Sequence, residues 1–218
     1  MIINYWNWLL HAWKKPGEYV HGKSWYGILT LFIENLLVLL GLAIGLTGIV
    51  NKYYNINDMN STMNMMYSSS VLRIHSLLIY VMLYLCFADF LIIGAAYLGY
   101  RYSHNSEIKF SNYVNRVAQY SSYNLFISLV LFLSFLGMGS LTLLVAVCLC
   151  LSILLLIVSA NAPILMDSVG VVQDRLIGTI FSTTAAALVI VLTVGLVFST
   201  AYSQMWGFIS QILNSLFG

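Results

Sequence analysis

Charged residues are scarce in this chain. Asp, Glu, Lys and Arg make up only 7% of its 218 residues, whereas hydrophobic residues make up 61%. Soluble domains carry about 25% charged residues. A water-soluble fold with so little charge would lack the polar side chains that cover a surface, so we expect lipid to be part of its solvent. The composition therefore predicts an integral membrane protein rather than a soluble domain.

A strong excess of one charge sign is also missing. The net charge is +2, and the basic residues are dispersed, which excludes the electrostatic footprint of a nucleic-acid-binding protein. The three cysteines (Cys86, Cys148 and Cys150) all fall in apolar stretches, so we expect them to be small packing residues rather than disulfide partners or metal ligands.

Motifs that indicate an enzyme are absent from the sequence. It contains no H-E-x-x-H motif, no paired Cys/His ligand set, no G-x-G-D motif and no glycine-rich nucleotide loop. No nucleophile is recognisable beside a base. We therefore expect no catalytic residues, no cofactor and no metal site, and we predict that the protein is not an enzyme.

Long apolar runs dominate what is present. A membrane-spanning helix needs about 17–25 predominantly apolar residues, and five stretches meet or approach that length. The third and fourth are separated by the glycine-rich segment 137–140, which predicts a tight turn. The polar segment 51–70 predicts a flexible outer loop. We expect an all-α polytopic membrane helical bundle over residues 25–202, with about five transmembrane helices at 25–50, 71–100, 122–136, 141–162 and 177–202.

Amphipathic helices are predicted at both ends of the chain. In residues 1–15, one helical face carries Tyr5, Trp6 and Leu9, while Lys14 and other polar residues lie opposite. Such a helix is typical of one lying in the headgroup plane. Residues 203–218 repeat the pattern without charge. Both are expected to be interfacial helices that contact membrane lipids.

The distribution of basic residues predicts the orientation. Cytoplasmic loops of membrane proteins are enriched in Lys and Arg. With the N-terminus inside, the outer segments hold only Lys52 and Arg73. We therefore predict a multi-pass protein of the cell membrane with a cytoplasmic N-terminus and an outside C-terminus. The cytoplasmic segments then hold Lys14, Lys15, Lys23, Arg101, Lys109, Arg116 and Arg175.

Two carboxylates fall where lipid is expected. Glu34 lies about 13 Å along the first span and Asp89 about 18 Å from the same side on the second, at 1.5 Å per helical residue. An ionised carboxylate at mid-bilayer costs a few kcal/mol. Glu34 and Asp89, with Asn35 and Asn124, therefore form either an intramembrane proton- or cation-linked site or a set of hydrogen bonds that fixes helix packing. The second alternative is favoured.

A second polar site is predicted in the cytoplasmic loop between the fourth and fifth spans. Pro163 is expected to end or kink the fourth helix. Asp167, Asp174 and Arg175 follow it. Asp174 is placed to stabilise the N-terminus of the fifth helix. Helix initiation is the favoured role for this loop, and partner binding is the alternative.

Four segments resemble the Yip superfamily of five-helix membrane proteins. They are the aromatic, basic, proline-terminated segment 5–16, the polar segment 109–122, the end of the fourth span at 160–163, and residues 174–178. The chain is most similar to small members from Gram-positive bacteria that lack an N-terminal zinc ribbon. It departs from the family at Tyr123-Asn124, where the third span often begins with proline. The resemblance implies a five-helix bundle with no enzymatic chemistry that self-associates or binds a membrane partner.

Three functions are consistent with these features. The leading hypothesis is a non-enzymatic protein that organises, or is accessory to, other membrane components, as a homo-oligomer or with a membrane-protein partner. Small residues at helix-packing spacing, such as Gly41 and Gly45, would permit that association. The first alternative is a small transporter or channel subunit that uses Glu34 and Asp89. The second is an immunity or envelope-stress protein.

Overall fold

The fold is built from helices alone. The computed structural model describes residues 4–53, 61–104, 108–136, 142–167 and 170–217, so the predicted turn at 137–140 lies outside the described residues. Within those ranges no strand forms, and the all-α prediction is confirmed. The seven described helices are α1 (Tyr5–Lys14), α2 (Tyr26–Tyr53), α3 (Ser61–Ser103), α4 (Phe110–Tyr120), α5 (Asn124–Leu136), α6 (Thr142–Met166) and α7 (Arg175–Phe217).

Four helices are long and apolar enough to cross a bilayer. The crossing segments lie in α2, α3, α6 and α7, and in an apolar stretch of 18 residues from each of them no more than 28% of the residues are buried within the bundle. The remaining apolar side chains face outward, which is stable only where lipid surrounds them. A polytopic membrane helical bundle therefore forms as predicted. The segments are Tyr26–Gly48, Val71–Ser103, Leu143–Met166 and Arg175–Gln204.

The third predicted span is a bent pair of helices. α5 has 13 residues and is about 20 Å long, which is short of the roughly 30 Å hydrocarbon core. α4 precedes it at an angle of 62°, and the two helices together are long and apolar enough to cross a bilayer once. The break holds Ser121 and Ser122, where the Asn124 amide donates to the Ser121 carbonyl at 2.7 Å. The described helices thus supply four segments able to cross a bilayer, or five if α4 and α5 together form one bent crossing.

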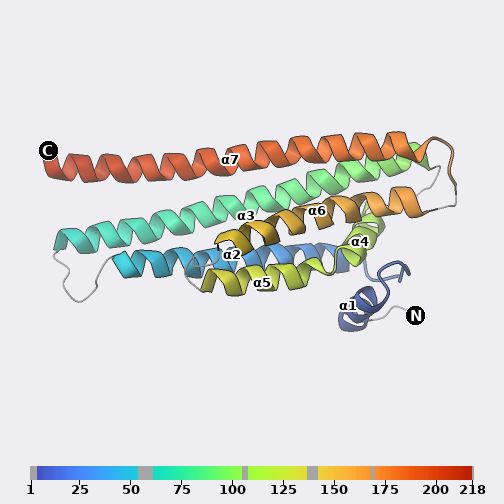
Figure 1. Cartoon of the computed structure of the whole chain (residues 1–218), viewed down its shortest axis with the longest axis horizontal. Helices are drawn as coiled ribbons and strands as arrows, with labels where there is room; N and C mark the ends of the chain where they lie inside the picture. Colours follow the sequence, from blue (N-terminus) through green and yellow to red (C-terminus); the bar gives the residue numbers. More distant parts are fainter. Residues whose placement is uncertain (1–3, 54–60, 105–107, 137–141, 168–169, 218) are drawn as a thin grey trace.

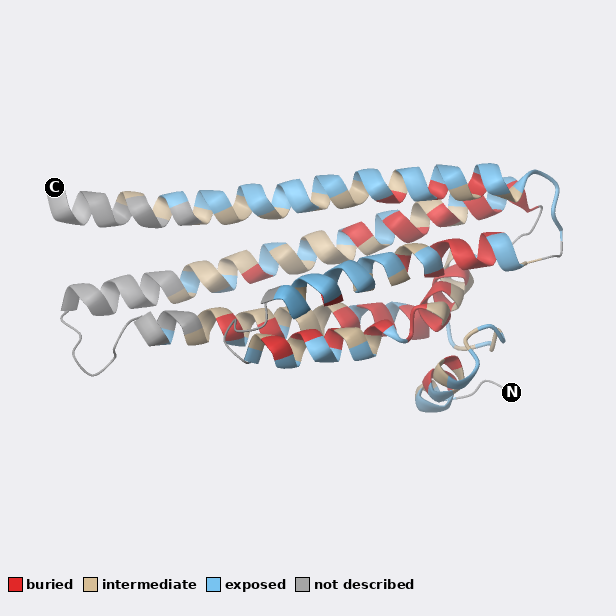
Figure 2. Cartoon of the chain, viewed as in Figure 1, coloured by how far each residue is buried: buried red, intermediate tan, exposed pale blue. Residues whose placement is uncertain are grey.

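The polar elements gather at one end of the bundle. Because successive crossings alternate in direction, α1, α4, the end of α6 and the start of α7 meet there, and the C-terminus lies at the opposite end (Figure 1). We call this end the N-terminal end. Buried residues are concentrated near it, where α4 packs between α2 and α6, whereas the outer side of α7 is exposed (Figure 2).

Several helices are longer than the sequence indicated. α3 begins at Ser61, inside the predicted loop 51–70, because extending an existing helix costs far less than nucleating one. α6 continues past Pro163 to Met166 and ends one turn later than expected. α7 is continuous from Arg175 to Phe217, so residues 203–217 prolong the last helix instead of forming the separate helix that was expected. The apolar face predicted for 203–218 rests largely on side chains outside the described set.

Candidate functional site

The four intramembrane residues singled out from the sequence form two hydrogen-bonded pairs. Asn124 Nδ2 donates to Glu34 Oε2 at 3.0 Å, and Asn35 Nδ2 donates to Asp89 Oδ2 at 2.7 Å. Glu34 and Asn35 are consecutive on α2, and consecutive helical residues point about 100° apart. One therefore faces α5 and the other faces α3, so the dipeptide joins three helices.

The two pairs differ in how well they are satisfied and enclosed. Glu34 is 4% exposed and Asn124 is 5% exposed, and Glu34 Oε1 and Asn124 Oδ1 have no hydrogen-bond partner among the described residues. A buried polar atom without a partner carries a desolvation cost of about 1–3 kcal/mol. Asp89 and Asn35 are only partly buried. The Glu34 pair is therefore part of the packed interior, whereas the Asp89 pair is accessible from outside.

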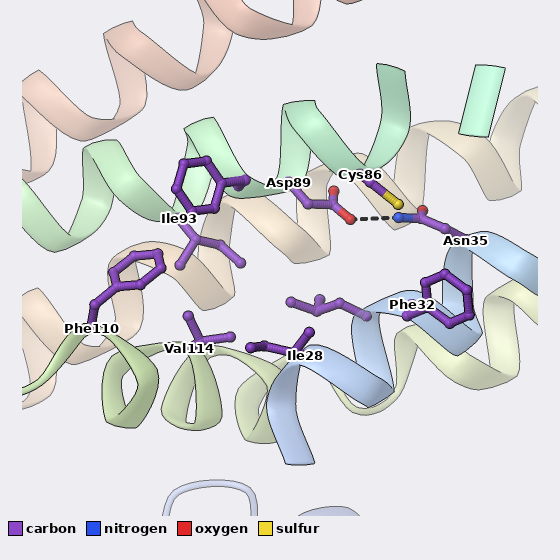
Figure 3. Close-up of a pocket in the computed structure, with 10 residues that line it drawn as sticks. Ile28, Phe32, Asn35, Cys86, Asp89, Ile93, Phe110 and Val114 are labelled. Atoms are coloured by element: carbon purple, nitrogen blue, oxygen red, sulfur yellow. Dashed lines mark hydrogen bonds between the residues drawn. The ribbon is translucent and has the colours of Figure 1, made fainter. Parts of the chain in front are cut away.

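Asp89 and Asn35 line a groove between α2 and α3. The groove has a volume of about 220 Å³, and α4 contributes Phe110 and Val114 to its opposite wall (Figure 3). Apart from the Asp89 carboxylate and the Asn35 amide, its wall is apolar or carries a thiol. The remaining lining residues are Ile28, Leu31, Phe32, Cys86, Phe90 and Ile93.

The predicted loop site separates into two parts with different roles. Asp174 Oδ1 accepts a hydrogen bond from the Leu176 amide at 2.8 Å, as expected of a residue that caps the start of α7. Arg175 Nη1 donates to the Leu165 carbonyl at 2.9 Å and so satisfies a carbonyl in the last turn of α6. Both interactions fit the favoured role in helix initiation. Asp167 makes different contacts.

Asp167 lies in a polar cluster at the N-terminal end. Its carboxylate pairs with the Arg116 guanidinium and accepts a hydrogen bond from the Tyr100 hydroxyl at 2.8 Å. His104 stacks on Tyr100 with ring centroids 4.5 Å apart, and its Nε2 donates to the Asp167 carbonyl at 3.1 Å. The cluster thereby ties the ends of α3, α4 and α6 together.

Arg116 also reaches the segment between α1 and α2. Its guanidinium lies 4.5 Å above the ring of Tyr19, a cation–π contact. Burial raises the pKa of the Tyr19 phenol, while the Arg116 cation acts in the opposite direction. Sequence reasoning counted Arg116 only as a basic loop residue, because no local pattern reveals a partner 51 residues away.

Asn115 and Gln119, one turn apart on α4, hold the segment between α1 and α2. Asn115 Oδ1 accepts from the Gly27 amide at 2.7 Å, and its Nδ2 donates to the Lys23 carbonyl at 2.9 Å. Gln119 accepts from the Val20 amide and donates to the Glu18 carbonyl. The sequence interpretation missed this role because polar residues in an apolar chain resembled a loop, although their i, i+4 spacing is helical.

Helix α1 is fixed to the bundle by its aromatic side chains. Trp13 Nε1 donates to the Ser122 carbonyl at 3.1 Å, and the Tyr123 hydroxyl donates to the Trp13 carbonyl at 2.6 Å. The Tyr5 hydroxyl lies 3.1 Å from the Thr30 hydroxyl. Trp8 is fully buried. Part of the aromatic face predicted to lie in the headgroup plane therefore packs against protein.

The described residues give no indication of metal chemistry, because no three His, Cys, Asp or Glu side chains among them are grouped to hold an ion. Comparison with known protein families, with curated proteins and with solved structures finds no match to this chain. The site must therefore be interpreted from its own geometry.

Proposed function

We propose that this protein is a non-enzymatic, Yip-like membrane protein that organises, or is accessory to, another membrane component. The observation that carries the proposal is that α1 is held in a fixed position against the bundle. Its inner side is pinned to the bundle by the hydrogen bonds of Tyr5, Trp13 and Tyr123. A helix that only contacts lipid headgroups needs no such bonds. Fixed geometry is what a partner-binding surface requires, because preorganisation lowers the entropic cost of binding.

The outer side of α1 continues into an apolar surface on α5. Trp6 is 67% exposed, and Leu10, Phe126 and Leu129 are also exposed. A groove of about 230 Å³ runs along this surface between α1, α2 and α5. Tryptophan and tyrosine are enriched among the residues that carry most of the binding energy at protein interfaces. We infer that a transmembrane helix, from a partner or from a second copy of the chain, packs here.

The proposed orientation places this surface at the cytoplasmic leaflet of the cell membrane. Seven of the nine basic residues belong to elements at the N-terminal end, and the other two, Lys52 and Arg73, belong to the far half of the bundle. Under the rule that basic residues are retained inside, the N-terminus is cytoplasmic and the C-terminus is outside. Labelling of intact cells with a membrane-impermeant thiol reagent tests that assignment. The reagent is expected to modify the Phe217→Cys variant and to leave the Gly17→Cys variant unmodified until the cells are permeabilised.

Photocrosslinking in cells tests the partner-binding role. A photoreactive amino acid at Trp6 is expected to give a discrete protein adduct, whereas the same group at Leu192, an exposed lipid-facing position on α7, gives only lipid adducts. In a W13F/Y123F background the adduct yield falls several-fold, because two of the three bonds that hold α1 are lost while an aromatic ring remains at each position. The mass of the adduct distinguishes a second copy from another protein.

Lipid adducts alone at both positions contradict the proposal. An adduct whose yield is unchanged by W13F/Y123F also contradicts it, since the surface would then not depend on how α1 is held. Elution of the double variant as a single species in detergent confirms that the comparison concerns a folded bundle.

Ion-coupled transport is a second candidate, and the position of Asp89 in the wall of an open groove favours it. If the protein conducts protons, vesicles containing it should acidify under a potassium diffusion potential, and E34Q and D89N should abolish the flux. D174N is the matched control, because it changes an exposed carboxylate that only caps α7. Absence of flux in the parent protein, or flux that survives both changes, excludes this function.

A further inference from the structure

The groove between α2 and α3 opens sideways, toward the surroundings of the bundle. Ile28, Phe32 and Phe90 are 56%, 46% and 59% exposed and form its rim, whereas Leu31 and Ile93 are buried and form its floor. All of these residues lie within the crossing segments or beside them. A molecule dissolved in the bilayer can therefore enter the groove directly, without passing through water.

The polar part of this groove holds a carboxyl group that has no cation beside it among the described residues. Asp89 Oδ2 is bonded to Asn35, and the ion pairs found in the described part of the chain all lie at the N-terminal end. Residues 26–48 of α2 and 74–100 of α3 contain no Lys or Arg. Glu34, next to Asn35, adds a second carboxylate without adding a cation. A carboxylate so far inside the bilayer costs a few kcal/mol unless something compensates it.

The apolar part of the groove is aromatic on more than one side. Phe32 comes from α2, Phe90 from α3 and Phe110 from α4, and Phe90 and Phe110 contact edge-to-face with ring centroids 5.6 Å apart (Figure 3). Aromatic faces attract organic cations, and more strongly when the site is desolvated. An acyl chain would gain only dispersion contacts here and would leave the carboxylate uncompensated. The wall therefore matches an apolar molecule that carries a positive charge.

We propose that this groove is a binding site for a small hydrophobic organic cation, with its charged nitrogen beside Asp89 and Asn35 and its apolar body on Phe32, Phe90 and Phe110. The volume sets the size of the ligand. An enclosed cavity of about 150 Å³ holds benzene, so a groove of about 220 Å³ holds one aromatic ring with a short substituted ammonium group. This site is separate from the α1 surface and does not depend on the role proposed for it.

Cys86 in the groove wall provides a direct measurement. In the full-length C148A/C150A protein in nanodiscs, Cys86 is the remaining thiol, and its alkylation by N-ethylmaleimide is followed by mass spectrometry. The probe is benzyltrimethylammonium, and the matched neutral probe is neopentylbenzene, which has the same shape without the charge. At pH 8, where protons compete least with the cation, benzyltrimethylammonium is expected to slow alkylation several-fold and neopentylbenzene is not.

Substitution of Asp89 then shows whether the cation is recognised by its charge or only fills the groove as an apolar molecule. D89N is expected to weaken protection by benzyltrimethylammonium about tenfold or more, the loss equivalent to one charged contact. D89E, which keeps the carboxylate, is expected to retain most of the protection by benzyltrimethylammonium. D174N is expected to leave that protection unchanged. The uninhibited alkylation rate and the elution profile of each variant report that the groove remains folded.

Three results overturn the proposal. They are equal protection by the neutral probe, protection by the cation that survives D89N, and no protection by the cation in the parent protein. The first two would identify the groove as a general apolar site for lipid chains, and the third would show that it takes up neither probe.

Discussion

Replacement of Gly99 by alanine weakens the bundle by about 1–3 kcal/mol, the cost of overpacking a well-packed contact. Gly99 of α3 and Gly178 of α7 lie close to each other, backbone against backbone. A Cβ at Gly99 would lie 2.6 Å from the Gly178 carbonyl oxygen, and one at Gly178 would lie 2.7 Å from the Gly99 oxygen. Both obstacles are backbone atoms, which cannot rotate away, so the helices must separate. Unfolding in a detergent titration, followed by tryptophan fluorescence, measures the loss.

The same substitution elsewhere on these helices should have the opposite sign. A Cβ at Gly94 of α3 or at Gly195 of α7 would meet nothing within 4 Å. Because alanine is the better helix former by up to about 1 kcal/mol, G94A and G195A are neutral or stabilising. G99A/G178A should lose less than the sum of its single variants, since one separation relieves both clashes. Equal effects of G99A and G94A would show that the crossing is not tight.

Asn115→Leu costs about 1–3 kcal/mol, because it leaves one buried backbone group, the Gly27 amide at the start of α2, without its partner. The Lys23 carbonyl also loses a hydrogen bond but keeps the one from the Tyr26 amide at 3.1 Å. Leucine has the same branching and the same number of side-chain heavy atoms as asparagine, so it is the apolar residue closest to it in shape. The expected result is a lower detergent midpoint together with faster tryptic cleavage at Lys23, because α4 no longer holds the segment between α1 and α2.

Asn112→Leu is the matched control for that change. Asn112 lies on the same helix, is only partly buried, and has no side-chain hydrogen bond among the described residues. N112L should therefore leave both the midpoint and the cleavage rate nearly unchanged. If N112L and N115L are equally destabilising, the polar residues of α4 stabilise the protein by solvating the helix and not by hydrogen-bonding to residues 18–27.

The membrane-spanning architecture was predictable because it depends on local composition. Any stretch of about 20 apolar residues is stable in a bilayer only as a helix, so α2, α3, α6 and α7 follow from hydropathy. Intramembrane carboxylates are equally visible, because Glu34 and Asp89 interrupt such stretches. Helix ends were less predictable. Pro163 does not end α6, and residues 61–70 extend α3, because a stable helix propagates through residues that would not nucleate one.

The N-terminal end shows where sequence reasoning stops. Asp167 was singled out, but Arg116, Tyr100 and His104 were not, because their contacts join residues that are far apart in the chain. The polar face of α4 resembled a loop. Asn115 and Gln119 hydrogen-bond to backbone groups of residues 18–27, and no sequence pattern reveals such backbone partners. A polar side chain in this protein is explained only when its partner is known.

By itself, then, the sequence determined that this protein spans a membrane as a helical bundle and that two carboxylates lie within it, because the cost of transferring each residue into lipid depends on that residue alone. Tertiary structure alone decided how those carboxylates are used. It enclosed Glu34 against Asn124 and left Asp89 in a sideways-opening aromatic groove, because exposure and charge compensation are set by which helices pack together. It likewise turned α1 from an independent interfacial helix into a fixed surface, through hydrogen bonds between residues more than 100 positions apart.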